Sequence, residues 1–225
     1  MKVCQLCAVD FTLKKFLLPL IDGMRAVGWE PTAVCSDGPF VAELRTQGYR
    51  VETVPIARSM NPIAGMRSVF ALVRLMRRER FDVLHAHTPV AALLGRIAAK
   101  LAGVPLVLYT AHGFYFHDEM PAWKRRLHVA LEWLGGRLTD FLFTQSAEDA
   151  EAAVCLGIAR AERTLAIGNG VSVARFDPAL QDGTALRREL GIPLTATVIG
   201  IVGRLVREKG YVEFLGAAEM LGAQY

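Results

Sequence analysis

Short apolar runs alternate with longer amphipathic stretches along most of the chain. The apolar runs contain few polar positions, as strands buried on both faces do, and they lie at 2–9, 31–36, 50–55, 82–87, 106–111, 141–146 and 164–169. Between them, apolar residues recur at helical spacing over 13–27, 39–47, 62–80, 90–102, 121–138 and 147–156. This alternation predicts an α/β fold, a Rossmann-like parallel sheet with helices on both faces.

Glycine and proline positions mark the ends of these helices. Gly28, Gly48, Gly103 and Gly157 each stand where a helical pattern gives way to the next strand, so we expect them to terminate helices. Pro19 falls inside the first helical pattern and predicts a kink or a late start there, because proline has no backbone N–H to donate.

The alternation ends near residue 170. Segment 171–195 contains two prolines and an Asp-Gly step, which favours an interdomain linker. Beyond it, the apolar run 198–202 predicts a buried strand, and a helical pattern begins near Tyr211. We therefore expect a first domain over 1–170, a linker over 171–195 and the start of a second domain over 196–225.

The charge of the chain is unevenly distributed. Residues 1–100 carry 14 Lys/Arg against 8 Asp/Glu (+6), whereas residues 101–225 carry 12 against 14 (−2). A basic half indicates either an anionic partner, such as phosphate groups or a membrane surface, or simply solvated helix faces. The basic residues are scattered over helices without interleaved aromatics, so nucleic-acid binding is not predicted.

The cysteines and the lengths of the apolar runs indicate the cellular compartment of the protein. Cys4 and Cys7 lie three residues apart in a predicted strand, so their thiols point to opposite faces, which favours buried free cysteines over a redox or metal pair. Free thiols are typical of a reducing cytoplasm. No uncharged apolar run approaches the ~18 residues of a membrane span. We expect a cytoplasmic protein that at most touches the membrane surface.

Polar and small residues gather where the predicted strands end. Parallel sheets bind ligands at the carboxyl ends of their strands, so we expect a cleft there, lined by Asp10, Phe11, Thr12, His87, Gly113, Phe114 and Asn169. The stretch "TAHGFYFH" follows the fifth strand. Its His112-Gly113 step would let the backbone approach a ligand, and its aromatics could stack on a sugar; alternatively they form a lid over the core.

The histidines raise the question of a metal. His85 and His87 share one face of a strand, and His112, His117 and Asp118 are further possible zinc ligands. No arrangement fixes three ligands around one ion, so no metal is predicted, and we expect His85 to be a hydrogen-bonded, semi-buried side chain. The G-x-G-x-x-G, G-x-x-x-x-G-K-[ST] and G-x-S-x-G motifs are absent from the sequence, and no cofactor is predicted.

The stretch "GRLVREKG" offers the groups that a diphosphate requires. Gly203 permits close backbone approach, Arg204 and Lys209 supply positive charge, and a helix N-terminus follows. We expect these three residues to bind a diphosphate, with Arg207 and Glu208 facing solvent and pairing with each other.

Four stretches together resemble a known family. "DVLHAHTPVAALLGRIAAKLAGVPLVLYTAHGFYFH", "TDFLFTQSAEDAEAAVCLGI", "AIGNGVSVARFDP" and "GIVGRLVREKGYVEFLGAAEML" are similar, in order and spacing, to the retaining family 4 glycosyltransferases of the GT-B fold, in the branch that builds bacterial capsular, exopolysaccharide or lipid-linked glycans. Two departures stand out: Asp10-Phe11-Thr12 replace a usual Gly-Gly pair, and Ser172 replaces a usual Asp.

The resemblance implies transfer of a sugar, with retention, from a nucleotide-diphosphate sugar to a glycan or lipid-linked acceptor. The acceptor would lie against the first domain and the nucleotide against the second, with His112 in the position of the family's histidine near the reacting sugar. Because only one strand and one helix of the second domain are present, we expect a truncated, inactive enzyme. The alternatives are a GT-B nucleotide-sugar epimerase and a non-catalytic sugar-binding or partner subunit.

Affinity for anionic membranes is a further expectation. The residues that suggest it are clustered cations and one neighbouring tryptophan: Lys14, Lys15, Arg74, Arg77, Arg78, Arg80, Trp123, Lys124, Arg125 and Arg126.

Overall fold

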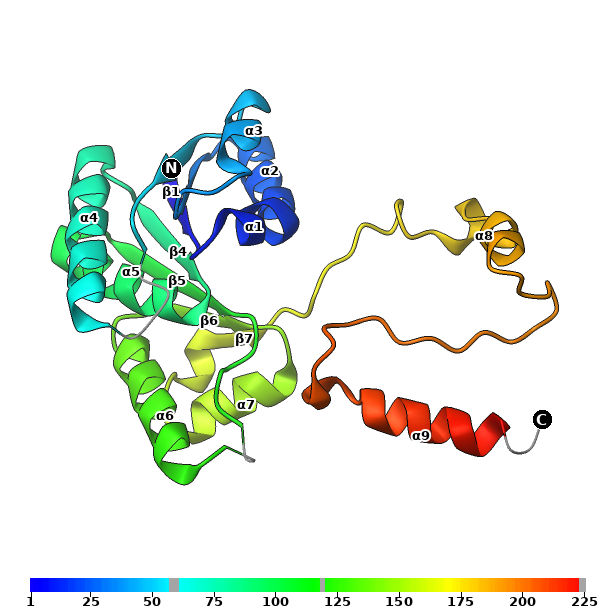
Figure 1. The fold of residues 1–225 in the computed structure, drawn as a ribbon. Helices are drawn as coiled ribbons and strands as arrows, with labels where there is room; N and C mark the ends of the chain where they lie inside the picture. Colours follow the sequence, from blue (N-terminus) through cyan, green and yellow to red (C-terminus); the bar gives the residue numbers. More distant parts are fainter. Residues whose placement is uncertain (57–60, 118–119, 223–225) are drawn as a thin grey trace. The chain divides into compact units, whose positions relative to one another are not determined.

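The computed structural model describes residues 1–56, 61–117 and 120–222 (Figure 1). The chain divides into two compact units, Met1–Asn169 and Gly170–Tyr225, each considered by itself below.

Unit 1 is built on one parallel sheet. Its described part contains seven strands in the order β3-β2-β1-β4-β5-β6-β7, and each predicted strand is found: β1 Lys2–Leu6, β2 Glu30–Cys35, β3 Val51–Thr53, β4 Val83–His87, β5 Leu106–Ala111, β6 Phe141–Thr144 and β7 Thr164–Ala166. Every residue of β4 is buried, as expected for a central strand covered on both faces. The predicted α/β class with a Rossmann-like parallel sheet is confirmed.

Helices cover both faces of this sheet, as predicted (Figure 1). The apolar cluster that contains Leu13, Ile21 and Leu44 packs one face, and the cluster that contains Leu72, Ala91 and Ala153 packs the other. The helices of unit 1 are α1 Asp10–Thr12, the π-helical η1 Leu13–Leu17, α2 Leu18–Ala26, α3 Val41–Thr46, α4 Pro62–Glu79, α5 Pro89–Ala102, α6 Ala122–Gly136, α7 Ala147–Cys155 and the short η2 Ala161–Arg163.

The predicted helix ends and the predicted irregularity are confirmed. Gly28, Gly48, Gly103 and Gly157 all have positive φ, between 65° and 85°, a conformation that costs glycine little. Pro19 lies in the first turn of α2, directly after π-helical η1. The interruption therefore stands next to the residue that cannot donate a backbone hydrogen bond.

The cysteines of the first two strands behave as the sequence predicts. Cys4 belongs to the apolar cluster on one face of the sheet, whereas Cys7 and Cys35 belong to the cluster on the other, and all three are buried free thiols. Burial raises the pKa of each thiol, for Cys35 to about 12. These side chains are inert parts of the core, and Cys155 is the exposed one.

Unit 2 contains short helices joined by extended segments: η3 Pro178–Leu180, α8 Thr184–Glu189, η4 Arg207–Lys209 and α9 Tyr211–Gly222. The helix predicted to begin near Tyr211 is confirmed. The prediction of a buried strand at 198–202 is wrong: this segment has no strand, and Val198, Ile199 and Val202 are more than half exposed. A strand needs a neighbour for its backbone N–H and C=O groups, and the described part of unit 2 supplies none.

Within the described ranges, no helix is long and apolar enough to cross a membrane.

Candidate functional site

The sheet reverses its strand order between β1 and β4. Strands β2 and β3 follow β1 on one side, and β5, β6 and β7 follow β4 on the other. In doubly wound sheets, ligands bind at the carboxyl edge beside such a switch point. We therefore expect functional residues in the loops that follow β1 and β4.

Thr88 marks this switch point with strained backbone. It has φ 63° and ψ 131°, and its Oγ1 accepts a hydrogen bond from the backbone N–H of Ala8, 3.1 Å away, so it ties the β4 turn to the β1 loop. A β-branched residue rarely has positive φ, and such strain is concentrated at functional sites. No sequence signal reports a φ angle, so this strain at Thr88 could not be predicted.

The predicted residues Asp10, Phe11 and Thr12 form α1, the short helix that follows β1. Asp10 is buried, and its carboxylate accepts hydrogen bonds from the backbone N–H groups of Phe11 (2.9 Å) and Phe40 (2.7 Å). Gly38 lies so close to this carboxylate that an added Cβ would collide with it. Asp10 thus anchors two loops of the edge to each other, while Thr12 is half-buried.

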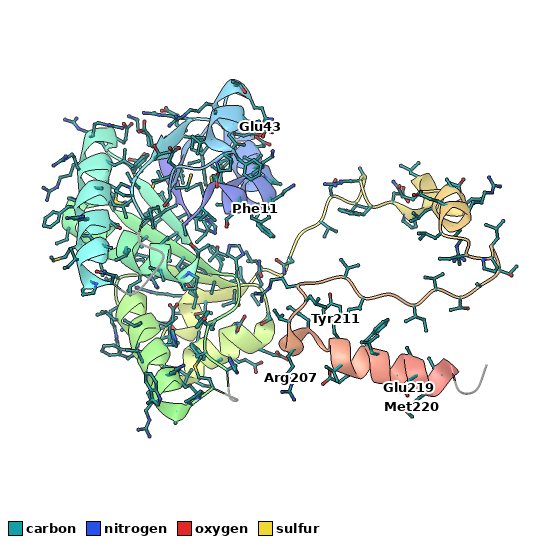
Figure 2. All side chains as sticks on the ribbon, in the orientation of Figure 1. Phe11, Glu43, Arg207, Tyr211, Glu219 and Met220 are labelled. Atoms are coloured by element: carbon teal, nitrogen blue, oxygen red, sulfur yellow. The ribbon has the colours of Figure 1, made fainter. Side chains whose placement is uncertain are left out.

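Phe11 presents an aromatic surface at the same edge. Its side chain, labelled in Figure 2, is half exposed. Its ring centroid lies 6.4 Å from that of Phe40. The Nζ of Lys14 lies 4.3 Å from the Phe40 ring centroid and pairs with Glu43 at 2.6 Å. An aromatic face beside a positive charge suits contact with a sugar or an anionic group.

The aromatic stretch after β5 contains both core-facing and exposed side chains. Gly113 has φ 101°, which lets the chain turn directly after His112. Phe114 and Phe116 stack at 5.0 Å and pack against the core, whereas Tyr115 is exposed and contacts His128, with ring centroids 4.9 Å apart. Phe114 thus covers the core, and His112 and Tyr115 stay accessible.

Three histidines form a row that reaches this edge. His85 and His87 lie on one face of β4 with ring centroids 4.3 Å apart, and the rings of His87 and His112 follow at 5.3 Å. Burial is the main cause that lowers each pKa: to about 4 for His85, well below its usual value for His87, and less far for the exposed His112. At neutral pH, all three rings are uncharged.

The ring nitrogens of this row are used in hydrogen bonds. His85 is buried, and its Nε2 lies 2.7 Å from Thr110 Oγ1, as expected of a satisfied histidine. Across the described ranges, no group of three or more His, Cys, Asp and Glu side chains is placed to hold a metal ion. His117 is exposed, and Asp118 lies outside the described residues.

The predicted diphosphate site lies in unit 2. The hydroxyl of Tyr211 donates a hydrogen bond to the carbonyl oxygen of Gly203 at 2.8 Å, and a Cβ built on Gly203 would lie 3.9 Å from Lys209 Cγ. Gly210, with φ 74°, directly precedes α9. The fold thus brings Gly203 and Lys209 together ahead of a helix N-terminus. Arg204 lies in the same turn, Arg207 is exposed, and the side chain of Glu208 lies outside the described residues.

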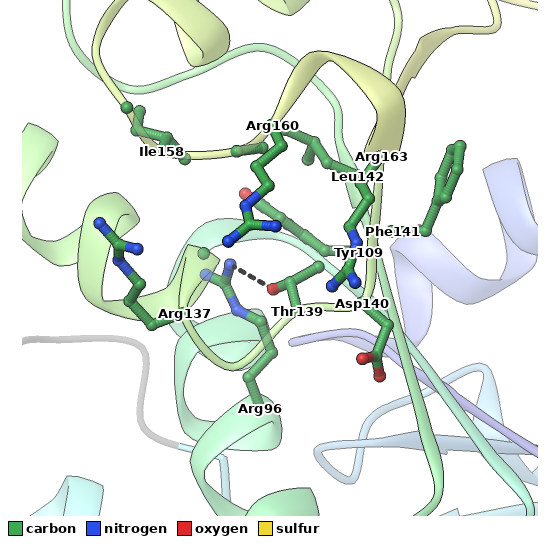
Figure 3. A pocket seen from close by; sticks show the side chains of 13 residues that line it. Arg96, Tyr109, Arg137, Thr139, Asp140, Phe141, Leu142, Ile158, Arg160 and Arg163 are labelled. Atoms are coloured by element: carbon green, nitrogen blue, oxygen red, sulfur yellow. Dashed lines mark hydrogen bonds between the residues drawn. The ribbon is translucent and has the colours of Figure 1, made fainter.

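The principal cavities of unit 1 lie elsewhere. One of about 420 Å³ stands where α6 ends and β6 begins, and its lining includes Arg96, Arg160 and Arg163 (Figure 3). Buried Arg96 pairs with Glu132 at 3.2 Å and donates to Thr139 Oγ1 at 3.3 Å. Another cavity, of about 480 Å³, is an apolar groove along α4 and α5. Neither is lined by a predicted site residue, so the candidate site is an open edge. Asn169 is exposed at the end of unit 1.

The fold defines a Rossmann-like α/β protein, with polar and aromatic side chains gathered at the switch point of its sheet. Residues 13–170 match the family described as "Glycosyl transferase 4-like domain", and the chain belongs to this family.

Curated relatives agree with this assignment, and a solved structure shares the fold. The chain is 29% identical over 217 residues to "UDP-Gal:alpha-D-GlcNAc-diphosphoundecaprenol alpha-1,3-galactosyltransferase" of Escherichia coli, a match that covers 91% of this chain and 56% of that protein. It is 22% identical over 210 residues to the capsular polysaccharide biosynthesis glycosyltransferase CapM of Staphylococcus aureus (91% and 54%). The crystal structure of a glycosyltransferase from Rickettsia africae aligns with a TM-score of 0.73 at 17% identity (98% and 57%). The chain thus spans about half the length of the proteins it matches.

Proposed function

We propose that this chain is part of a retaining glycosyltransferase of bacterial surface polysaccharide synthesis. The observation that carries the proposal is exposed His112 at the switch-point edge of a glycosyl transferase 4-like domain. In this proposal, His112 faces the reacting sugar, and the acceptor lies along the aromatic and polar surface of Phe11, Thr12 and Tyr115.

The donor is proposed to be a nucleotide-diphosphate sugar and the acceptor a glycan or lipid-linked glycan. The Escherichia coli relative, named for a UDP-Gal donor and a diphosphoundecaprenol-linked acceptor, supports both substrate classes. That name also specifies an alpha linkage, which retention produces from an alpha-linked donor.

The proposed chemistry is departure of the nucleoside diphosphate, with attack by the acceptor hydroxyl on the same face of the sugar. The C1–O bond to the diphosphate breaks, the bond from C1 to the acceptor oxygen forms, and the leaving diphosphate takes the proton of the acceptor hydroxyl. Arg204, Lys209 and the N-terminus of α9 would stabilise the negative charge that grows on the diphosphate. The protein's contribution is then positioning and electrostatics, and no cofactor takes part.

The 225-residue chain alone is proposed to be inactive, because its relatives are almost twice as long. The functional test therefore uses the complete gene product. It is incubated with radiolabelled UDP-sugars and vesicles that contain a diphospholipid-linked sugar. Label in the lipid fraction supports transfer. Epimerised donor formed without acceptor would instead support the epimerase alternative, and sugar binding without any turnover would support a non-catalytic subunit.

A membrane surface is proposed as a further partner, through α4. Ile63, Met66 and Phe70 are exposed along one side of this helix, with Arg67 and Arg74 on the same stripe. Apolar side chains flanked by arginines favour the interface of an anionic bilayer. This location suits an enzyme whose acceptor is a lipid, and it would place the protein at the cytoplasmic face of a membrane.

A further inference from the structure

A continuous row of side chains runs from the centre of the sheet to its carboxyl edge. Gln5 of β1 pairs in register with His85 of β4, and both are buried. Gln5 Nε2 lies 3.3 Å from His85 Nδ1, and Gln5 Oε1 lies 2.9 Å from His87 Nε2. One amide therefore bridges the two imidazoles of β4.

The row continues outward through His112. His87 Nδ1 lies 3.1 Å from His112 Nε2, and His112 Nδ1 lies 2.6 Å from Gln145 Nε2. Gln145 directly follows β6 and is half-buried, whereas Gln5 is fully enclosed. Five polar side chains, two from strand interiors and three from strand ends, thus connect the core to the exposed edge.

The amide of Gln5 determines where the protons of this row reside. An amide oxygen can only accept and an amide NH₂ can only donate, so His87 must carry its proton on Nε2. Because burial keeps His87 neutral, its Nδ1 has a lone pair and accepts from His112 Nε2–H. Neutral His112 then has a lone pair on Nδ1, where the amide NH₂ of Gln145 donates.

A second contact fixes the orientation of the Gln5 amide. Gln5 Nε2 lies 3.2 Å from the sulfur of Met24, which is a weak acceptor. Turning the amide over would lose this contact by placing its oxygen against the sulfur, and it would reverse the tautomer of every histidine in the row. Met24 therefore selects one of two complementary proton arrangements.

We propose that Gln5 and His87 are positioning residues that hold His112 as the neutral Nε2–H tautomer. The lone pair of His112 Nδ1 is thereby presented at the carboxyl edge, where Gln145 occupies it until a ligand hydroxyl donates in its place. Only the identity of the ligand, a sugar hydroxyl, rests on the proposed function. The tautomer itself is a property of unit 1. It makes His112 a hydrogen-bond acceptor toward the ligand, without a positive charge beside the sugar.

The test is the tautomeric state of His112, measured by long-range ¹H–¹⁵N correlation NMR on the 225-residue chain at pH 7.5. The Nε2–H pattern is expected for His112 in the unsubstituted protein. An Nδ1–H pattern there would overturn the proposal without any variant, so the result does not depend on how a substitution affects folding.

Variants then test the direction of control. Gln5→Leu removes the acceptor of His87 Nε2–H, and His112 should change from one tautomer to a mixture. Thr110→Val is the matched control, because Thr110 contacts His85 at the opposite end of the row and His112 should keep its Nε2–H pattern. A folded Gln5→Leu protein, verified by its amide spectrum, with unchanged His112 signals would refute the positioning role.

This measurement separates the two proposals. A complete gene product that fails to transfer sugar while His112 shows the Nε2–H pattern would remove the proposed function and leave the positioning device standing. Active transfer together with an Nδ1–H pattern would support the proposed function and overturn the positioning role of Gln5 and His87.

Discussion

Individual residues at the carboxyl edge differ in what their side chains do. Asp10 accepts two backbone hydrogen bonds and joins two loops, whereas His112 is exposed and Phe11 is half exposed. We therefore expect substitutions at Asp10 to affect folding first, and substitutions at His112 to affect the reaction first.

His112→Ala should lower turnover of the complete gene product with little change in melting temperature. The ring makes two side-chain hydrogen bonds, but one partner is half-buried Gln145, and the exposed position leaves no closed cavity. A loss in kcat/KM of roughly 10²–10³-fold is expected from removing one preorganised polar contact to the reacting sugar. Normal activity with a large loss of stability would show instead that His112 is a core-edge residue.

Arg204→Ala and Lys209→Ala should each lower kcat/KM of the complete protein by roughly 10²–10³-fold, as loss of one preorganised electrostatic contact does. These cations lie ahead of the N-terminus of α9, where negative charge is stabilised. Arg207→Ala is the matched control and should lower kcat/KM only slightly. Equal damage from Arg207→Ala would mean that the diphosphate site must be reassigned within the turn.

The histidine row predicts an acid-sensitive fold. Above pH 6.5, both folded and unfolded chains keep His85 and His87 neutral. As pH falls below 6.5, the unfolded chain binds protons that the folded chain resists until about pH 4 at His85, so the free energy of unfolding falls. The loss approaches about 1.4 kcal/mol per pH unit for each histidine.

Urea unfolding at pH 7.5, 6.5 and 5.5 measures this dependence, and His85→Gln should reduce the slope. Constant stability from pH 7.5 to 5.5 would contradict the burial of these rings as neutral groups.

The residue scale is also where sequence reasoning misses most. It singled out His87, His112 and Phe11 because histidine and aromatic residues at strand ends are chemically unusual. It did not single out Gln5, Gln145 or the backbone conformation of Thr88. A glutamine in an apolar strand does not reveal its partners, which come from other strands, and a φ of 63° at Thr88 follows from tertiary packing alone.

Whole elements were predicted more completely than sites. Each strand of unit 1 is recognisable because burial on both faces produces an apolar run, and each long helix because one face packs on the sheet. The segment 198–202 has the same apolar pattern, yet it forms no strand. The local apolar pattern gives a segment the propensity to form a strand. The strand forms only where another strand provides partners for its backbone hydrogen bonds.

Helix α4 carries the membrane prediction. Reversing two charges on its exposed stripe, Arg67→Glu with Arg74→Glu, should weaken binding to anionic vesicles at least about tenfold, since each near-surface cation contributes on the order of 1 kcal/mol. Vesicle flotation at low and high salt measures this. Arg175→Glu with Arg188→Glu in unit 2 changes the net charge equally and should have little effect. Equal losses from both pairs, or equal binding to neutral vesicles, would show that α4 is not the contact.

At the scale of the whole molecule, the two units differ in how much they bury. The buried hydrophobic residues all belong to unit 1, on both faces of its sheet, while none of the described residues of unit 2 is buried. Burial of apolar surface is the main source of folding free energy, so the cooperative stability of the chain should reside in unit 1.

Limited proteolysis should therefore remove unit 2 and leave a fragment that begins at Met1 and ends between residues 170 and 210. Exposed segments with few tertiary contacts open at little cost and are cleaved first. Mass spectrometry of a thermolysin time course identifies the surviving fragment. A chain of residues 1–169 is the matched control, and its melting temperature should lie within about 2 °C of the 225-residue chain, because the buried apolar clusters of the described residues consist of unit 1 side chains alone. If unit 2 resists cleavage as long as unit 1, or if its removal lowers the melting temperature by about 8 °C or more, the two units share stabilising contacts, and the donor-side residues Arg204 and Lys209 then belong to the same cooperative fold as His112.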